Sequence, residues 1–74
     1  MIENEIDKWT NKIKEVVDKI ETDNQEMLKN MKAYIEDSKH FKENRDFLRS
    51  FECIVWAWAI FETCRELGIF KLKR

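Results

Sequence analysis

The sequence predicts an all-α protein, an up-down-up bundle of three helices that forms a single domain over residues 1–74. Three observations predict this fold. Apolar residues recur at intervals of three and four, as they do on one face of a helix. The chain has no proline and one glycine, so it lacks the residues that punctuate strands and hairpins. Two short polar breaks divide the pattern, and short connections favour antiparallel neighbours.

The first helix is expected over residues 2–21. Its apolar residues form one narrow stripe between charged and amide side chains: Ile2, Ile6, Trp9, Ile13, Val16, Val17 and Ile20. Most of the stability of such a helix comes from packing, so we expect this stripe to dock against the other two helices.

The second helix is expected over residues 24–42. The break before it offers two alternative capping boxes, Thr22 with Gln25 or Asp23 with Glu26, either of which would satisfy free amides at the helix start. The helix then continues at the same spacing through a second set of residues: Met27, Leu28, Met31, Tyr34, Ile35, Ser38 and Phe41.

The third helix is expected over residues 47–67, followed by a basic tail over residues 69–74. Asp46 is a good N-cap for this helix. Gly68 is placed for a left-handed C-cap, and Ile69 could supply the apolar contact that accompanies such caps.

The third helix carries apolar residues on two opposite faces. One face holds Phe47, Phe51, Ile54, Val55, Trp58 and Phe61, and the other holds Cys53, Trp56, Ala57, Ile60 and Cys64. A helix that is apolar nearly all round is normally buried on all sides. We therefore expect the second face to form an interface, made by Cys53, Trp56, Ile60 and Cys64, with another copy or a larger protein. In the alternative, the first two helices splay around the third and cover it.

A chain of this size usually needs support beyond its core, such as disulfides, a metal or oligomerisation. Cys53 and Cys64 lie about 16 Å apart along one helix, far beyond the roughly 7 Å that a disulfide allows. We expect them to be free thiols in a reducing compartment. One histidine and two distant cysteines do not make a metal site, and no cofactor is expected. Oligomerisation and aromatic packing therefore remain as the two expected sources of additional stability.

The second half of the chain is basic, although the net charge of the whole is −1. Candidate phosphate contacts are Lys39, Lys42, Arg45, Arg49, Lys71, Lys73 and Arg74, which would suit an RNA- or ribosome-associated accessory protein. The fold offers a simpler explanation. It brings the second turn next to Glu3, Glu5 and Asp7, and the tail next to Glu21, Asp23 and Glu26, so the charges largely neutralise one another within the molecule.

Glu62 is a candidate buried acid, since it shares a face with Phe51, Val55 and Trp58. It is either an acid satisfied at the edge of the core or a contact for a ligand or partner. A buried carboxylate is costly unless it is paired, and Arg65 is placed to pair with it along the helix. No phosphate-binding loop, HExxH, CxxC or nucleophile elbow is present in the sequence. We therefore expect no enzyme but an interaction module or a small accessory subunit.

The sequence also indicates a soluble cytoplasmic protein. Its N-terminus lacks the basic and apolar regions of a signal peptide. Its longest apolar run, Cys53 to Phe61, is far shorter than the roughly 20 residues that span a membrane.

Three stretches in the C-terminal half resemble a known family. Tyr34, Asp37, Ser38 and Phe41 match its pattern Y-x-x-D-S/A-x-x-F, and Arg45 to Glu52 is similar to its helix start G-D-x-x-x-A-F-E. Residues 56–62, with 67–70, resemble Y-A-x-G-W-L-D-A…R-L-G-L. The family is the small, mostly archaeal one known as domain of unknown function 357.

The resemblance implies a short helical bundle, an archaeal cytosolic origin and no established activity. The family's Asp corresponds to Glu62, its glycine to Ala59 and its tryptophan to Ile60, which implies a different close contact on the third helix. The second and third helices also resemble, faintly, the HEPN ribonuclease group, but that group's Arg-and-His signature is absent here.

Overall fold

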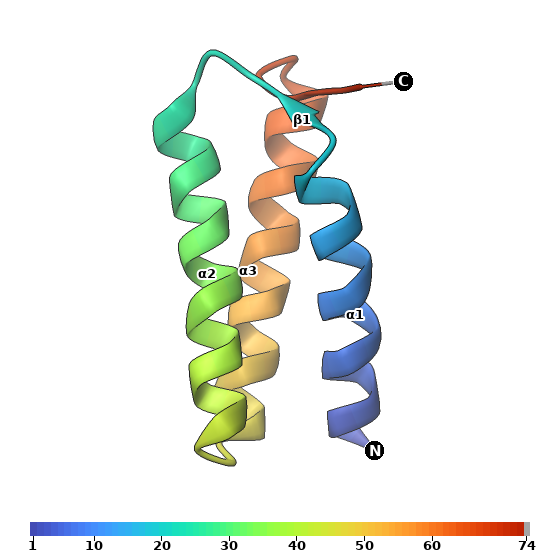
Figure 1. The fold of residues 1–74 in the computed structure, drawn as a ribbon, viewed down its shortest axis with the longest axis vertical. Helices are drawn as coiled ribbons and strands as arrows, with labels where there is room; N and C mark the ends of the chain where they lie inside the picture. Colours follow the sequence, from blue (N-terminus) through green and yellow to red (C-terminus); the bar gives the residue numbers. More distant parts are fainter. Residues whose placement is uncertain (74) are drawn as a thin grey trace.

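The computed structural model describes residues 1–73 as three helices and two short strands. The helices are α1 (Ile2–Val17), α2 (Gln25–Glu43) and α3 (Phe47–Glu66), and the strands are β1 (Ile20–Glu21) and β2 (Lys71–Leu72). The helices run up, down and up, and α3 lies between and behind the other two (Figure 1). The predicted all-α, three-helix fold is therefore confirmed.

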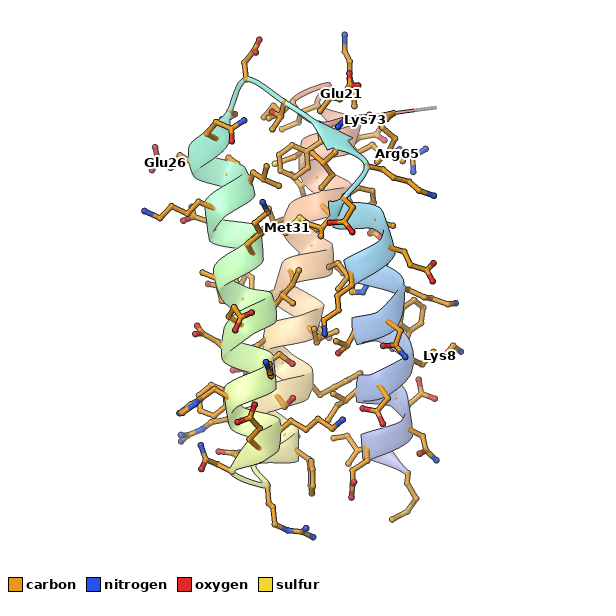
Figure 2. All side chains as sticks on the ribbon, viewed as in Figure 1. Lys8, Glu21, Glu26, Met31, Arg65 and Lys73 are labelled. Carbon is orange, nitrogen blue, oxygen red and sulfur yellow. The ribbon has the colours of Figure 1, made fainter. Side chains whose placement is uncertain are left out.

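The core forms where α1 and α2 pack on α3, while α1 and α2 contact each other little. Each helix contributes buried apolar residues: Ile6 and Ile13 from α1, Met31 and Ile35 from α2, and Ile54, Ala57 and Phe61 from α3. Figure 2 shows Met31 directed between the helices, whereas the charged side chains of Lys8 and Glu26 point outward. In residues 1–73, no helix has the length and apolar content needed to cross a membrane.

The first helix ends at Val17, so its expected end at residue 21 was wrong. Ile20 and Glu21 instead form β1, which pairs antiparallel with β2, so that Ile20 faces Leu72 and Glu21 faces Lys71. Ile20 is buried in both the expected and the observed structure. The sequence could not reveal this strand, because the spacing of Ile20 from Val17 also fits a helical stripe. An alternation of one apolar and one polar residue is too short to indicate a strand.

The expected tail over residues 69–74 is likewise part of the folded domain through residue 73. Phe70 is buried in the core, and the amide of Lys73 donates to the carbonyl of Lys19 at 2.8 Å. The Thr22 hydroxyl donates to the carbonyl of Ile69 at 2.7 Å. These contacts fasten residues 69–73 to the α1–α2 connection at the top of the bundle in Figure 1.

The start of α2 is capped by Asn24, so both expected capping boxes were wrong. The Asn24 side chain accepts a hydrogen bond from the amide of Met27 at 3.0 Å. Thr22 and Gln25 do interact, because the Gln25 amide group donates to the Thr22 carbonyl at 2.8 Å, but that carbonyl lies before the cap. Three adjacent residues were all suitable caps, and local preference alone does not choose among them.

Both ends of α3 follow the prediction. Asp46 caps the start and accepts from the amide of Arg49. At the other end, Gly68 has φ 77°. The amide of Ile69 donates to the carbonyl of Cys64 at 2.7 Å, and the amide of Gly68 donates to the carbonyl of Arg65 at 3.1 Å. This pair of bonds is a Schellman motif, which satisfies the last free carbonyls of the helix.

The end of α2 repeats that motif with arginine in place of glycine. Arg45 has φ 62°. Its amide donates to the carbonyl of Lys42 at 3.0 Å, and the amide of Asp46 donates to the carbonyl of Phe41 at 2.8 Å. A side chain in the left-handed region clashes with the following carbonyl, at a cost of roughly 1–2 kcal/mol.

We expect Arg45→Gly to be more stable than Arg45→Ala by about 1 kcal/mol, because glycine relieves the left-handed strain but gains flexibility in the unfolded chain. Both variants remove the guanidinium group that lies 5.6 Å from the centre of the Phe47 ring, so this contact cancels in the comparison. Urea unfolding followed by circular dichroism measures the difference. Equal stability of the two variants would show that the turn is not strained at this residue.

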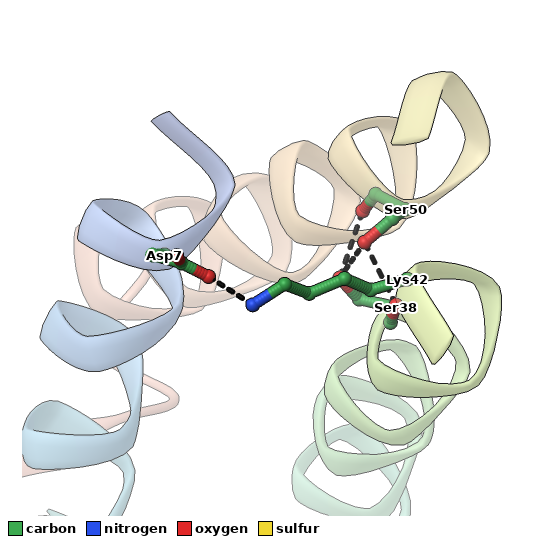
Figure 3. Close-up of polar contacts among 4 residues, drawn as sticks. All are labelled: Asp7, Ser38, Lys42 and Ser50. Carbon is green, nitrogen blue, oxygen red and sulfur yellow. Dashed lines mark hydrogen bonds and ion pairs between the residues drawn. The ribbon is translucent and has the colours of Figure 1, made fainter. Parts of the chain in front are cut away.

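Two buried serines bring α2 and α3 close together. The Ser38 hydroxyl donates to the carbonyl of Ser50 at 2.8 Å, and the Ser50 hydroxyl donates to the carbonyl of Ser38 at 2.7 Å (Figure 3). Their small side chains let the two backbones approach, and the reciprocal bonds satisfy both buried hydroxyls. The contact fixes how far α2 wraps around α3.

Candidate interaction surface on the third helix

One side of α3 is covered by neither α1 nor α2. We call this side the open face, and it consists of residues spaced three or four apart with their immediate neighbours: Leu48, Arg49, Glu52, Val55, Trp56, Ala59, Ile60, Thr63, Glu66 and Leu67. All are exposed except Ile60, which is partly buried. Trp56 at the centre is 54% exposed, and Leu48 and Leu67 near the ends are 74% and 69% exposed. Large side chains of these types carry an energetic cost in water that a partner would relieve.

Trp56 is held in place although half of it faces solvent. Its ring stacks on Tyr34 of α2, with the ring centres 6.2 Å apart and the planes inclined by 19°. A shallow groove of about 450 Å³ surrounds this aromatic pair and is also lined by Asn30, Ala33, Asp37 and Ile60. Stacking on Tyr34 therefore helps to order Trp56, the aromatic residue at the centre of the open face.

Two of the four predicted interface residues were wrong. Cys53 and Cys64 are 8% and 2% exposed and belong to the core of the single chain, whereas Trp56 and Ile60 do lie on the open face. The Ser38–Ser50 contact draws α2 over the side of α3 that carries Cys53. The helical wheel placed these residues correctly around α3, but it contains no information about how closely α2 approaches.

Both cysteines have free thiols, as expected. Burial raises the pKa of the Cys64 thiol above its ordinary value. Burial also raises the pKa of Cys53, and the negative charges of Asp37 and Glu52 raise it further. Both groups are therefore protonated near neutral pH, and a protonated thiol is a poor nucleophile and a poor metal ligand.

The predicted buried acid was also wrong, because Glu62 is exposed. It lies at the rim of a shallow apolar depression that is also lined by Trp9, Phe51, Val55 and Trp58, where α1 stops covering α3. Among residues 1–73, no ion pair joins Glu62 to Arg65. The carboxylate keeps its contact with water and therefore needs no partner.

The predicted basic residues that the structure describes are divided between the two ends of the bundle, and three of them lie beside acids. Lys42 pairs with Asp7 across α2 and α1 (Figure 3). Arg49 lies 3.6 Å from Asp46, measured between Nε and Oδ2. At the opposite end, Lys71 faces Glu21 in the β-ladder. Lys39, Arg45 and Lys73 are exposed, and Arg74 lies outside the described residues.

Sequence reasoning missed most of this surface. It assigned Val55, which is 50% exposed, to the opposite apolar face, and it considered Arg49 only as a phosphate contact. The other open-face residues that it did not assign to an interface are Leu48, Glu52, Ala59, Thr63, Glu66 and Leu67. Leu48 and Leu67 were assigned to no face because polar neighbours separate them from the apolar runs. Their positions on the wheel, in line with Glu52 and Thr63, would have revealed a strip along the whole helix. Tyr34 was assigned to the core of the second helix, and only the packing of α2 on α3 places it beside Trp56.

Comparison with known proteins agrees with this architecture. The crystal structure of a protein from Archaeoglobus fulgidus, assigned to the family model DUF357, is 42% identical and superposes with a TM-score of 0.92, covering 97% of this chain and 93% of that chain. No curated protein matches. The family model for proteins of unknown function DUF357 matches residues 1–70, which extends the resemblance from the C-terminal half through α1. The chain therefore belongs to the DUF357 family.

Proposed function

We propose that this protein is a non-enzymatic interaction module that binds another protein surface through the open face of α3. The observation that carries the proposal is Trp56, which is 54% exposed at the centre of a strip that also contains Leu48, Val55 and Leu67. Tryptophan and tyrosine side chains contribute a disproportionate share of binding energy at protein interfaces. The remaining residues of the strip would exclude water around them.

The scaffold supports this role because it presents the open face on a rigid element. α3 is held on its other sides by α1 and α2, and Trp56 is stacked on Tyr34. Groups that are already ordered lose less conformational entropy on binding, so more of the contact energy is available for affinity.

The reactive side chains support a non-enzymatic role. The two thiols are buried with raised pKa values, and Glu62 is exposed to solvent. The His40 ring is exposed and contacts the side-chain amide of Asn44 at 3.3 Å. Within residues 1–73, none of these groups has the activating neighbour that general-base or nucleophilic catalysis requires.

Site-specific photocrosslinking tests the proposal. A photoreactive phenylalanine analogue replaces Ala59 on the open face or, as the matched control, Lys29 on the exposed side of α2. After irradiation in a native cell extract, we expect a protein adduct of defined mass from position 59 and none from position 29. The adduct should disappear when Trp56→Glu is added. An absence of adducts, or equal adducts from both positions, would contradict the proposal.

An RNA- or ribosome-associated role is the second candidate. Its supporting observation is that Lys39 and Arg45 are exposed near the turn between α2 and α3. It has less support because Lys42 and Arg49 at the same end lie beside acids of the chain. Binding through these groups would weaken steeply as salt is raised, so a mobility shift of RNA that is absent at low salt would eliminate this role.

A further inference from the structure

We propose that the partner of the open face is a second copy of this chain, and that two α3 helices pack antiparallel about a two-fold axis. This inference rests on the proposed function and specifies its partner. The two-fold axis would pass beside the midpoint between Ala57 and Trp58. Residues equally far from that midpoint in opposite directions then face one another across the two copies.

The open face is complementary to itself in this arrangement. Trp56 of one copy faces Ala59 of the other, so the largest side chain of the strip meets the smallest. Glu52 faces Thr63, whose hydroxyl can donate to the carboxylate. Each contact occurs twice because the interface is symmetric. Leu48, Val55, Ile60 and Leu67 flank these layers on both sides and add apolar area.

The charges also match under the same operation, because Arg49 of one copy faces Glu66 of the other. The side chain of Arg49 is 69% exposed, and its separation of 3.6 Å from Asp46 leaves it free to turn toward a second partner. A parallel alignment would instead place Arg49 against Arg49 and Glu66 against Glu66. Like charges placed opposite each other disfavour association, so the pattern selects the antiparallel arrangement.

The overall charge permits self-association. The net charge is −1 per chain, so two copies repel each other little. In the antiparallel alignment Glu62 comes near Glu52 of the second copy. Glu62 is exposed at the rim of the apolar depression beside Trp58, where water screens its charge. Binding of an unrelated protein would not require the open face to be complementary to itself. The symmetric pairing of a large side chain with a small one, and of a positive charge with a negative one, is expected of a face that binds a second copy.

Reversal of single charges tests this arrangement. Arg49→Glu and Glu66→Arg each place like charges opposite each other twice per dimer, and we expect each to lower the association constant about tenfold. Both substitutions suit the helix dipole, because an acid enters the first turn of α3 and a base enters the last. Circular dichroism should therefore show unchanged folding of both variants.

An equal mixture of the two variants provides the decisive comparison. One copy then carries acids at positions 49 and 66 and the other carries bases, so both pairs are attractive in the mixed dimer. We expect sedimentation velocity to show association restored to at least the wild-type level in the mixture only. A wild-type chain that stays monomeric, or a mixture no tighter than its components, would overturn the two-fold arrangement. A photocrosslink to a different protein would then leave the proposed function intact, whereas no crosslink would end both.

Discussion

Replacing Phe70 with alanine is expected to lower the free energy of unfolding by about 3 kcal/mol. Phe70 is 2% exposed and packs in the core although it follows the last helix. Its amide donates to the carbonyl of Cys64 at 3.0 Å, so the Schellman turn at Gly68 directs the ring back into the bundle. Removing the ring loses the burial of apolar surface and leaves a cavity that the rigid turn cannot close.

Thermal unfolding followed by circular dichroism checks this prediction. For a domain of this size, a loss of about 3 kcal/mol lowers the melting temperature by roughly 12–24 °C. Leu72→Ala is the matched control, because Leu72 is a nearby apolar residue of β2 but is exposed. We expect this substitution to lower the free energy of unfolding by less than about 1 kcal/mol. Equal effects of the two substitutions would show that the segment after α3 is not part of the core.

Trp58→Ala is expected to weaken the attachment of α1 to α3 and to lower the free energy of unfolding by about 3 kcal/mol. The Trp58 ring meets Trp9 edge to face, with the ring centres 5.8 Å apart, and meets Phe61 in the same way at 5.7 Å. Its indole NH donates to the carbonyl of Trp9 at 3.2 Å. α1 makes fewer contacts with α3 than α2 does. We therefore expect this aromatic cluster to contribute a large share of the energy that docks α1 on α3.

Hydrogen exchange separates this effect from general destabilisation. In Trp58→Ala, amides of α1 should lose more protection than amides of α2, because the lost contacts lie between α1 and α3. Trp58→Phe keeps an aromatic ring and removes the hydrogen bond, so its cost should be about 1 kcal/mol. Equal losses of protection in α1 and α2 would contradict this role of Trp58.

The parts of the fold that the sequence predicted correctly depend on local signals. Asp46 and Gly68 mark the ends of α3 through the preferences of single residues. The inward stripes of α1 and α2 follow from helical spacing. Ile20 shows where this approach fails, because its position fits both a helical stripe and a buried strand residue, and only the distant pairing with Leu72 decides between them.

The candidate surface could be predicted only in part, because its limits depend on how closely the helices pack. The sequence indicated a surplus apolar face on α3 and placed Trp56 at its centre. It could not show that the reciprocal bonds of Ser38 and Ser50 bring α2 over Cys53, or that the coverage by α1 stops short of Glu62. These limits arise between residues that are distant in the sequence, and no single-helix pattern contains them.

The measurement that tests the central claim most directly is the solution mass of the wild-type protein and of Trp56→Glu by light scattering, over a tenfold range of concentration. The account predicts that the wild-type mass rises from 9.1 kDa toward twice that value as concentration increases, while the folded variant stays at 9.1 kDa. A wild-type mass that stays at 9.1 kDa throughout, or a variant that associates as strongly as the wild type, would contradict self-association through the open face.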